Sequence, residues 1–127
     1  MKFLVNGTRR LEGEIGIPGN KSGTARSIVL GSLAEGVTRV HNPLLNIDSF
    51  SIIGMFRAMG TKIDTSRSDL WVIEGTGGNL SVPGEVLNAG NSGTGYYMVN
   101  AAASLIDGTS VIAGDYQICR RPAQPQI

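Results

Sequence analysis

The sequence contains one cysteine, one histidine and one tryptophan among its 127 residues, and it has no long apolar run. The single thiol of Cys119 excludes an internal disulfide, and with only His41 beside it a zinc cluster cannot form. No stretch approaches the roughly 20 apolar residues of a transmembrane helix, because Asn6, Gly7 and two arginines interrupt the apolar start. These absences disfavour metal chemistry and a membrane partner, and they favour a cytoplasmic protein.

Charged residues are also few, and they are balanced. They make up 17% of the chain and leave a formal charge of +1. Proteins that bind nucleic acids or membrane surfaces normally carry a marked excess of lysine and arginine. We therefore expect no nucleic-acid partner, and any anion site must be built from local groups. The length, with 41% hydrophobic residues, suits one ordinary core.

Glycine, in contrast, is abundant at 18 residues, and several glycines belong to an internal repeat. Residues 14–40 resemble residues 79–112, at a spacing that grows from 65 to 72 residues along the match. We interpret the match as an ancient duplication with short insertions. The matched positions are Pro18-Gly19 with Pro83-Gly84, Ser22-Gly23-Thr24 with Ser92-Gly93-Thr94, Ser32-Leu33 with Ser104-Leu105, and Gly36 with Gly108.

Each copy of the repeat predicts the same order of elements. An alternating strand and a turn precede an amphipathic helix that opens at Ser-Gly-Thr, which makes Ser22 and Ser92 the expected helix caps. A glycine ends each helix, and a β-branched strand follows. The second copy runs out after this strand, before another helix can be completed.

The segment between the copies completes the first unit. Asp48-Ser49 can cap a helix that runs to Met59, and Gly60 ends it. Residues 62–65 and 70–74 have the composition of strands. The chain is therefore predicted to be an α/β (α+β) protein built from β-α-β-α-β-β units, one complete and one truncated.

The start of the first predicted helix gathers two cations and two hydroxyls in the sequence NKSGTAR, residues 20–26. Free N–H groups and the helix dipole favour an anion at such a position. Lys21 precedes the first turn and Arg26 shares a face with Ser22, so both cations could reach one phosphate or carboxylate. Helix capping with a solvated charge explains the pattern equally well. The glycine spacing does not match a Walker P-loop, which disfavours nucleotide binding.

Two more constellations suit an anion. Residues 90–95, GNSGTG, open the second predicted helix and leave a backbone that a ligand can approach closely. Arg120-Arg121-Pro122 follows a predicted strand, and the geometry of a guanidinium suits a bidentate contact with phosphate or carboxylate. A capped turn is the structural alternative for the first constellation, and an exposed loop is the alternative for the second.

At these constellations the sequence resembles the enolpyruvyl transferases, and within them the 3-phosphoshikimate 1-carboxyvinyltransferases. Four ordered motifs carry the resemblance, namely LEGEIGIPGNKS, AEGVTRVHNPLL, AGNSGT, and GD followed by RRP. The resemblance implies a fold of two domains, each made of three β-α-β-α-β-β units, with substrates in the cleft between them. It assigns residues 1–17 to a strand of the other domain and residues 18–127 to part of the N-terminal domain, so the C-terminal portion of the enzyme is a missing partner.

The same resemblance implies a reaction in the shikimate pathway of aromatic amino acid biosynthesis. The carboxyvinyl group of phosphoenolpyruvate moves to the 5-hydroxyl of shikimate 3-phosphate through a tetrahedral intermediate, without a metal or cofactor. The proton-transfer carboxylates lie in the other domain, so we expect no catalytic residue and no turnover from this chain alone. The implied phosphoenolpyruvate contacts are Lys21, Gly93 and Arg121, and the implied shikimate 3-phosphate contacts are Lys21, Ser22, Arg26 and Thr94, with Asn91 in a supporting role.

Departures from the family pattern keep alternatives open. Tyr97 stands where the family usually has an arginine. Before Arg26, residues 23–25 are Gly-Thr-Ala, where the family commonly has residues such as Ile-Ser-His. UDP-N-acetylglucosamine 1-carboxyvinyltransferases share the implied fold, but they carry Lys-Asn in place of Lys21-Ser22 and a loop cysteine in place of Tyr116. That branch is one alternative, and a non-catalytic anion-binding or assembly module with the same fold is another. Gly93 leaves room for phosphoenolpyruvate or the inhibitor glyphosate.

Overall fold

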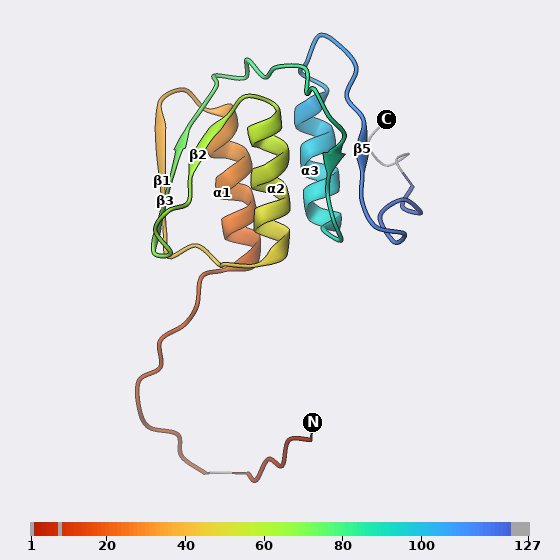
Figure 1. The fold of residues 1–127 in the computed structure, drawn as a ribbon. Coiled ribbons are helices and arrows are strands. Elements are labelled where there is room, and N and C mark those ends of the chain that lie inside the picture. The colour runs from red at the N-terminus through yellow and green to blue at the C-terminus, as the bar shows by residue number, and fades with distance from the viewer. Residues whose placement is uncertain (1, 8, 123–127) are drawn as a thin grey trace.

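Three helices stand side by side, with one small sheet next to α1 and a second next to α3 (Figure 1). The computed structural model describes residues 2–7 and 9–122. The mixed α/β class is confirmed, and the described chain stops after the first helix and strand of the second unit. In chain order the elements are α1 (Lys21–Leu33), β1 (Val37–His41), α2 (Ile47–Ala58), β2 (Lys62–Asp64), β3 (Leu70–Glu74), β4 (Leu87–Asn88), α3 (Gly93–Ala103) and β5 (Ile112–Ala113).

The larger sheet is antiparallel, with strand order β1-β3-β2. Its central strand, β3, pairs Trp71 with Val40 of β1 and Ile73 with Ile63 of β2. Successive side chains of a strand point to opposite faces, so Trp71 and Ile73 are both fully buried under the helices. In the smaller sheet β4 pairs in parallel with β5, and α3 forms the crossover that a parallel pair requires.

The core lies between the three helices and the larger sheet. At two points the packing is close enough that only a glycine fits without movement. A Cβ on Gly75 would lie 2.1 Å from the carbonyl oxygen of Ala34, and a Cβ on Gly95 would lie 2.8 Å from Cγ1 of Ile52. None of the helices within residues 2–7 and 9–122 has the length and apolarity needed to cross a bilayer. The largest fully buried side chains are Trp71, Phe56, Ile28, Ile52, Ile53, Met55, Met59 and Ile73.

The helices of the two repeat copies begin at different places in the matched sequence. In the first copy the side-chain oxygen of Asn20 accepts a hydrogen bond from the N–H of Gly23 at 2.6 Å. In the second copy Oγ of Ser92 accepts from the N–H of Gly95 at 3.0 Å. The predicted cap at Ser92 is confirmed, but the predicted cap at Ser22 is wrong, because Asn is as favourable a cap and starts the helix earlier.

The start of α2 also lies before the predicted position. Asn46 accepts from the N–H of Ser49 at 2.8 Å, so the cap is Asn46 and the prediction of an Asp48-Ser49 cap is wrong. Asp48 instead occupies the first turn, where a negative charge complements the helix dipole. The helix ends as predicted, with Gly60 at φ 97° just beyond it, a backbone conformation that glycine adopts without strain.

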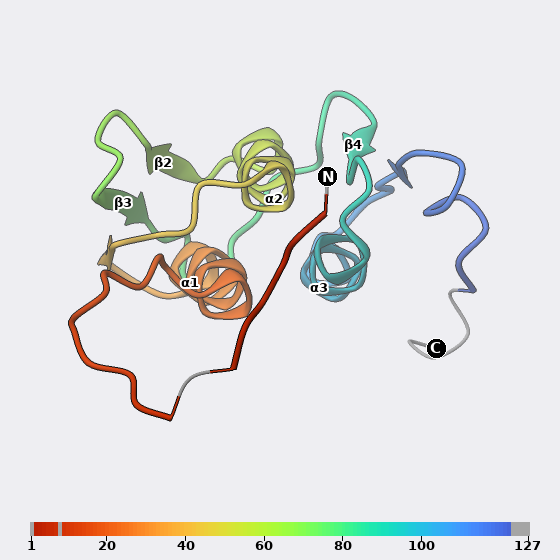
Figure 2. The same ribbon diagram turned by 90° about the horizontal axis from the view of Figure 1, so that it is seen from below.

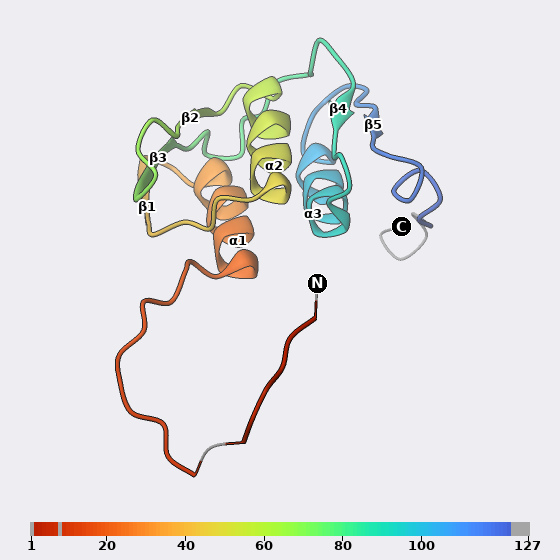
Figure 3. The same ribbon diagram turned by 60° about the horizontal axis from the view of Figure 1, so that its bottom comes forward.

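Neither of the strands predicted before the two Ser-Gly-Thr helices lies at its predicted position in the described structure. Residues 14–17 form no ladder, and the side chains of Ile15 and Ile17 are 86% and 76% exposed. Residues 9–17 run away from the helices (Figures 1 and 3). In the second copy the strand lies at Leu87–Asn88, after the predicted stretch, because this later segment reaches β5. The assignment of residues 1–17 to another domain stays a prediction.

Candidate functional site

All three helices begin at the same end of the molecule. Figure 1 shows α1, α2 and α3 rising together from their N-terminal ends, and Figure 2 shows them nearly end on. Their first residues are Lys21, Ile47 and Gly93. The N-terminal N–H groups of three helices and three positive dipole ends are therefore directed to one side of the molecule. This side suits a ligand with several anionic groups.

The first two turns of α1 carry two cations, each with a neighbouring partner. Nζ of Lys21 lies 2.6 Å from Oδ2 of Asp48, in the first turn of α2, and the lysine side chain remains 63% exposed. Nη1 of Arg26 donates to Oγ of Ser22 one turn earlier. Sequence reasoning missed Asp48, because nothing in the spacing of 27 residues marks it as the partner of Lys21.

In the described structure the side chains of Lys21 and Arg26 point in different directions, and their reach to one anion stays a prediction. Lys21 points to α2, whereas Arg26 lines a groove between α1 and α3. The helix start at Lys21 explains the difference, since two residues five apart on a helix lie on different faces. Both side chains are exposed and long enough to reorient. The buried hydroxyl nearby, on Thr24, accepts from the N–H of Leu44 at 2.9 Å and holds the loop that leads to α2.

The start of α3 brings together Gly93 and Arg121, two residues that the sequence singled out separately. The guanidinium of Arg121 lies against the α-carbon of Gly93. A Cβ built on Gly93 would be 2.7 Å from Cζ and Nη1 of Arg121 and 2.9 Å from Nη2. The absence of a side chain at this glycine therefore gives the guanidinium its position. Thr94 is exposed in the same turn.

Asn91, just before α3, donates through Nδ2 to Oδ2 of Asp115. The other carboxylate oxygen, Oδ1, accepts from the N–H groups of Gln117 at 2.9 Å and Ile118 at 3.0 Å. The hydrogen bond from Asn91, then that from the N–H of Ile118, lowers the pKa of Asp115 below its ordinary value, and the charge of Arg121 acts in the same direction. The GD of the fourth sequence motif marked this position, but no role was assigned to it.

Tyr97, which replaces the usual arginine, contacts the segment that carries Arg121. Its hydroxyl donates to the carbonyl oxygen of Pro122 at 3.2 Å, and its ring lies edge to face with that of Tyr96, with 5.1 Å between centroids. Cys119 is exposed, and its Sγ lies 3.3 Å from the carbonyl oxygen of Gly114. Within residues 2–7 and 9–122, no three His, Cys, Asp or Glu side chains gather as a metal site would require.

Two named relatives match most or all of this chain in sequence. The 3-phosphoshikimate 1-carboxyvinyltransferase of Acetivibrio thermocellus is 44% identical over 118 residues, which are 93% of this chain and 28% of that protein. The enzyme of the same name from Methanothermobacter thermautotrophicus is 36% identical over the whole chain and 30% of its own length. The chain thus spans less than a third of these relatives.

Solved structures agree with the sequence relatives. An EPSP synthase from Acinetobacter baumannii superposes with a TM-score of 0.82 and 34% identity, over 88% of this chain and 26% of that one. The family model of EPSP synthase, or 3-phosphoshikimate 1-carboxyvinyltransferase, matches residues 5–127. By this match and by the relatives across its whole length, the chain belongs to the EPSP synthase family.

Proposed function

We propose that this chain is the N-terminal portion of a 3-phosphoshikimate 1-carboxyvinyltransferase and that it supplies half of the substrate site. The complete enzyme would transfer the carboxyvinyl group of phosphoenolpyruvate to the 5-hydroxyl of shikimate 3-phosphate and release phosphate. The observation that carries the proposal is the contact of Arg121 with Gly93 at the start of α3. This contact lies at the end of the molecule where α1 presents Lys21.

The chemistry of both substrates suits this end. Each substrate carries a phosphate and a carboxylate, and a guanidinium can bind either group through two parallel hydrogen bonds. We assign Lys21, Gly93 and Arg121 to phosphoenolpyruvate, with Asn91 in support. We assign the guanidinium of Arg26 and the hydroxyls of Ser22 and Thr94 to shikimate 3-phosphate. Lys21 would contact both substrates.

Binding requires the lysine to change partner. In the described structure Lys21 pairs with Asp48, and because the lysine side chain is largely exposed, this partly exposed ion pair is worth only about 1 kcal/mol. A doubly charged phosphate beside two helix starts competes well with one carboxylate. Asp48 thus keeps the ammonium at the helix starts while leaving it available to a substrate.

Two exposed hollows support the view that the rest of the enzyme packs against this chain. The groove between α1 and α3 has a volume of about 350 Å³. Four positions on α1 and four on α3 and the turn that follows it line the groove, and each α1 position is 72 residues before its counterpart, as expected if a further copy of the repeat completes the packing. The lining residues are Arg26, Val29, Leu30 and Leu33 with Met98, Ala101, Ala102 and Leu105.

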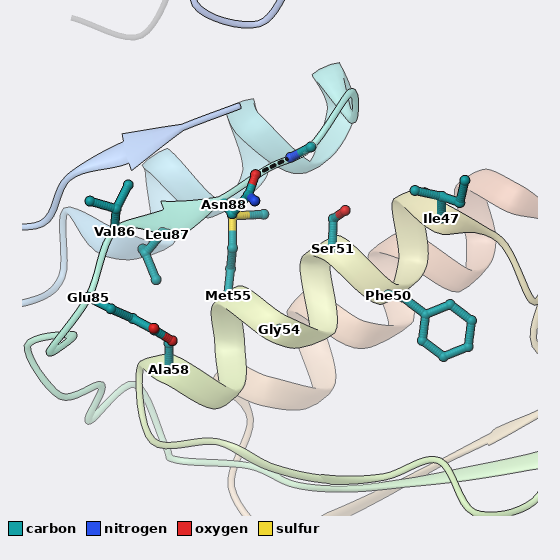
Figure 4. A pocket seen from close by; sticks show the side chains of 11 residues that line it. Ile47, Phe50, Ser51, Gly54, Met55, Ala58, Glu85, Val86, Leu87 and Asn88 are labelled. Carbon is teal, nitrogen blue, oxygen red and sulfur yellow. Dashed lines mark hydrogen bonds between the residues drawn. The ribbon is translucent and has the colours of Figure 1, made fainter. Parts of the chain in front are cut away.

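The second hollow lies between α2 and the strand β4 and has a volume of about 610 Å³. Figure 4 shows Phe50 and Met55 on α2, with Val86 and Glu85 on the opposite segment. Phe50 and Val86 are 48% and 53% exposed, although both are apolar. Covering such surface with more of the same chain is favourable at about 25 cal/mol per Å² of apolar area. We therefore propose that the chain alone binds substrates weakly and has no turnover.

A chimera tests the proposal. The matching 118 residues of the Acetivibrio thermocellus relative are replaced by this chain, and phosphate release is measured with phosphoenolpyruvate and shikimate 3-phosphate. We expect turnover from the chimera and none from the 127-residue chain alone. The variant Arg121→Ala in the chimera should lose saturation by phosphoenolpyruvate.

The outcomes separate the alternatives. A folded chimera that releases no phosphate with shikimate 3-phosphate overturns the proposal. Turnover with UDP-N-acetylglucosamine in its place would assign the chain to the other branch. Binding of both substrates without turnover would favour a non-catalytic module, for which the tyrosine at position 97 is the specific observation.

A further inference from the structure

We propose that Asp115 is a positioning residue for the phosphoenolpyruvate half of the site. One carboxylate oxygen holds Asn91 and the other holds the turn that leads to Arg121, so a single side chain sets both groups relative to α3. The inference rests on the proposed function, because Arg121 matters only if an anion binds beside Gly93.

The carboxylate of Asp115 joins two segments that are far apart in sequence. Asn91 precedes α3, whereas residues 115–119 follow β5. The main chain joins them as well, since the N–H of Asp115 donates to the carbonyl oxygen of Gly90 at 2.8 Å. A Cβ on Gly114 would lie 2.5 Å from that same carbonyl oxygen, so the two backbones pass in close contact. The backbone of Asp115 is therefore held in place independently of the hydrogen bonds that its side chain makes.

The path from Asp115 to the guanidinium is short and ordered by hydrogen bonds. The N–H of Cys119 donates to the carbonyl oxygen of Asp115 at 3.0 Å, and the N–H of Arg121 donates to that of Ile118 at 2.9 Å. Ile118 is only 2% exposed and belongs to the core. With Oδ1 of Asp115 closing the turn on the N–H groups of residues 117 and 118, the backbone of Arg121 has a defined direction.

The carboxylate is suited to this role and unsuited to touching a substrate. A negative charge facing a phosphate would repel it. Here the oxygens are already engaged by Asn91 and two N–H groups, and none of the ion pairs in the described part of the chain joins Asp115 to Arg121. The pKa of Asp115 lies below its ordinary value of 3.8, so the side chain is ionised at neutral pH and both oxygens are acceptors. The guanidinium of Arg121 therefore stays available to an anion.

The test uses the chimera and a double-mutant cycle. For Asp115→Ala we expect the KM for phosphoenolpyruvate to rise about tenfold to a hundredfold, the range that a displacement of about 1 Å can cause. The kcat and the KM for shikimate 3-phosphate should stay within about threefold, because Asp115 acts on one half of the site. In an Arg121→Ala background, which gives only kcat/KM because it does not saturate, Asp115→Ala should lower kcat/KM for phosphoenolpyruvate little further, since both changes remove the same contact.

Two further variants separate positioning from general damage. Asp115→Asn keeps an acceptor for the turn and can pair with Asn91 after an amide flip, so it should restore most of the loss. Asp107→Ala, at an exposed position beyond the far end of α3, is the matched control and should change neither KM. An undiminished effect of Asp115→Ala in the Arg121→Ala background would overturn the proposal, as would equal rises in both KM values.

A measurement on the 127-residue chain keeps the inference testable if the proposed function fails. Proton NMR contacts between the guanidinium of Arg121 and the α-protons of Gly93 should be present in the chain and lost in Asp115→Ala. The contacts of the buried Trp71 ring should remain, which shows that the core is folded. An inactive chimera with this loss refutes the function alone, whereas persistent contacts between Arg121 and Gly93 refute the positioning role.

Discussion

The substitution Gly93→Ala should separate ligand binding from stability. The new Cβ would lie 2.7 Å from Cζ and Nη1 of Arg121, where ordinary contact begins at 3.4 Å. The guanidinium must therefore retreat by about 0.7 Å or more, and this is a small movement for the end of a flexible, exposed side chain. The free energy of unfolding should change by less than about 1 kcal/mol, since alanine is the better helix former.

The same retreat should be costly for phosphoenolpyruvate. A displaced guanidinium loses bidentate geometry, and a misplacement near 1 Å can cost up to about a hundredfold in binding or rate. We expect the KM for phosphoenolpyruvate in the chimera to rise at least about tenfold in Gly93→Ala, with the KM for shikimate 3-phosphate within about twofold. Urea denaturation of the 127-residue chain gives the stability, and steady-state kinetics gives both KM values.

Gly95→Ala, two residues along the same helix, is the matched control. Its Cβ would lie 2.8 Å from Cγ1 of Ile52 and from Oγ of Ser92, both in the interior. Overpacking a core typically costs about 1 to 3 kcal/mol, so this variant should lose stability in the urea titration. The reasoning is refuted if Gly93→Ala leaves the KM for phosphoenolpyruvate unchanged, or if it destabilises the chain as much as Gly95→Ala.

Three further predictions concern charges and hydrogen bonds at the helix starts. Asp48→Asn removes the carboxylate that pairs with Lys21, so inorganic phosphate should bind the 127-residue chain up to about fivefold more tightly in an NMR titration. Weaker binding would show that Asp48 and phosphate do not compete for Lys21. Tyr97→Phe removes the bond to the carbonyl of residue 122, worth about 1 kcal/mol, and should raise the KM for phosphoenolpyruvate about twofold to fivefold, with Tyr96→Phe as the control. Because the pKa of Asp115 is lowered from 3.8, its contribution to stability is present above that value and is lost as pH falls through the lower folded value. Asp115→Asn should therefore flatten the acid dependence of the urea midpoint below pH 3.8 and leave its slope at neutral pH unchanged.

Much of the fold follows from local pattern. The strand over residues 70–74 was predicted with the bounds that β3 has, because its apolar composition is bounded by polar turns on both sides. The repeat predicted that α1 and α3 would be equivalent, and both do begin at the same end of the molecule. Gly60 marked the end of α2 through a property of glycine itself.

Other features depend on groups that no local pattern reveals. The sequence does not distinguish Asn20 from Ser22 as the cap of α1, since the two residue types are nearly equivalent and tertiary packing decides between them. Lys21 pairs with Asp48 and Asn91 pairs with Asp115, each across two different elements, so neither pairing can be predicted from a periodic pattern in the sequence. Residues 14–17 have the alternation of a strand, but a strand needs an edge to pair with.

The unequal starts of α1 and α3 show how two similar segments can use the same Ser-Gly-Thr tripeptide in different ways. Because Asn20 caps α1, the hydroxyl of Ser22 does not cap the helix and instead accepts a hydrogen bond from Arg26. Where Ser92 begins the helix, its hydroxyl is buried and serves the backbone. The residue at which the helix begins, and not the sequence Ser-Gly-Thr, therefore decides whether the serine hydroxyl can reach a ligand or caps the helix.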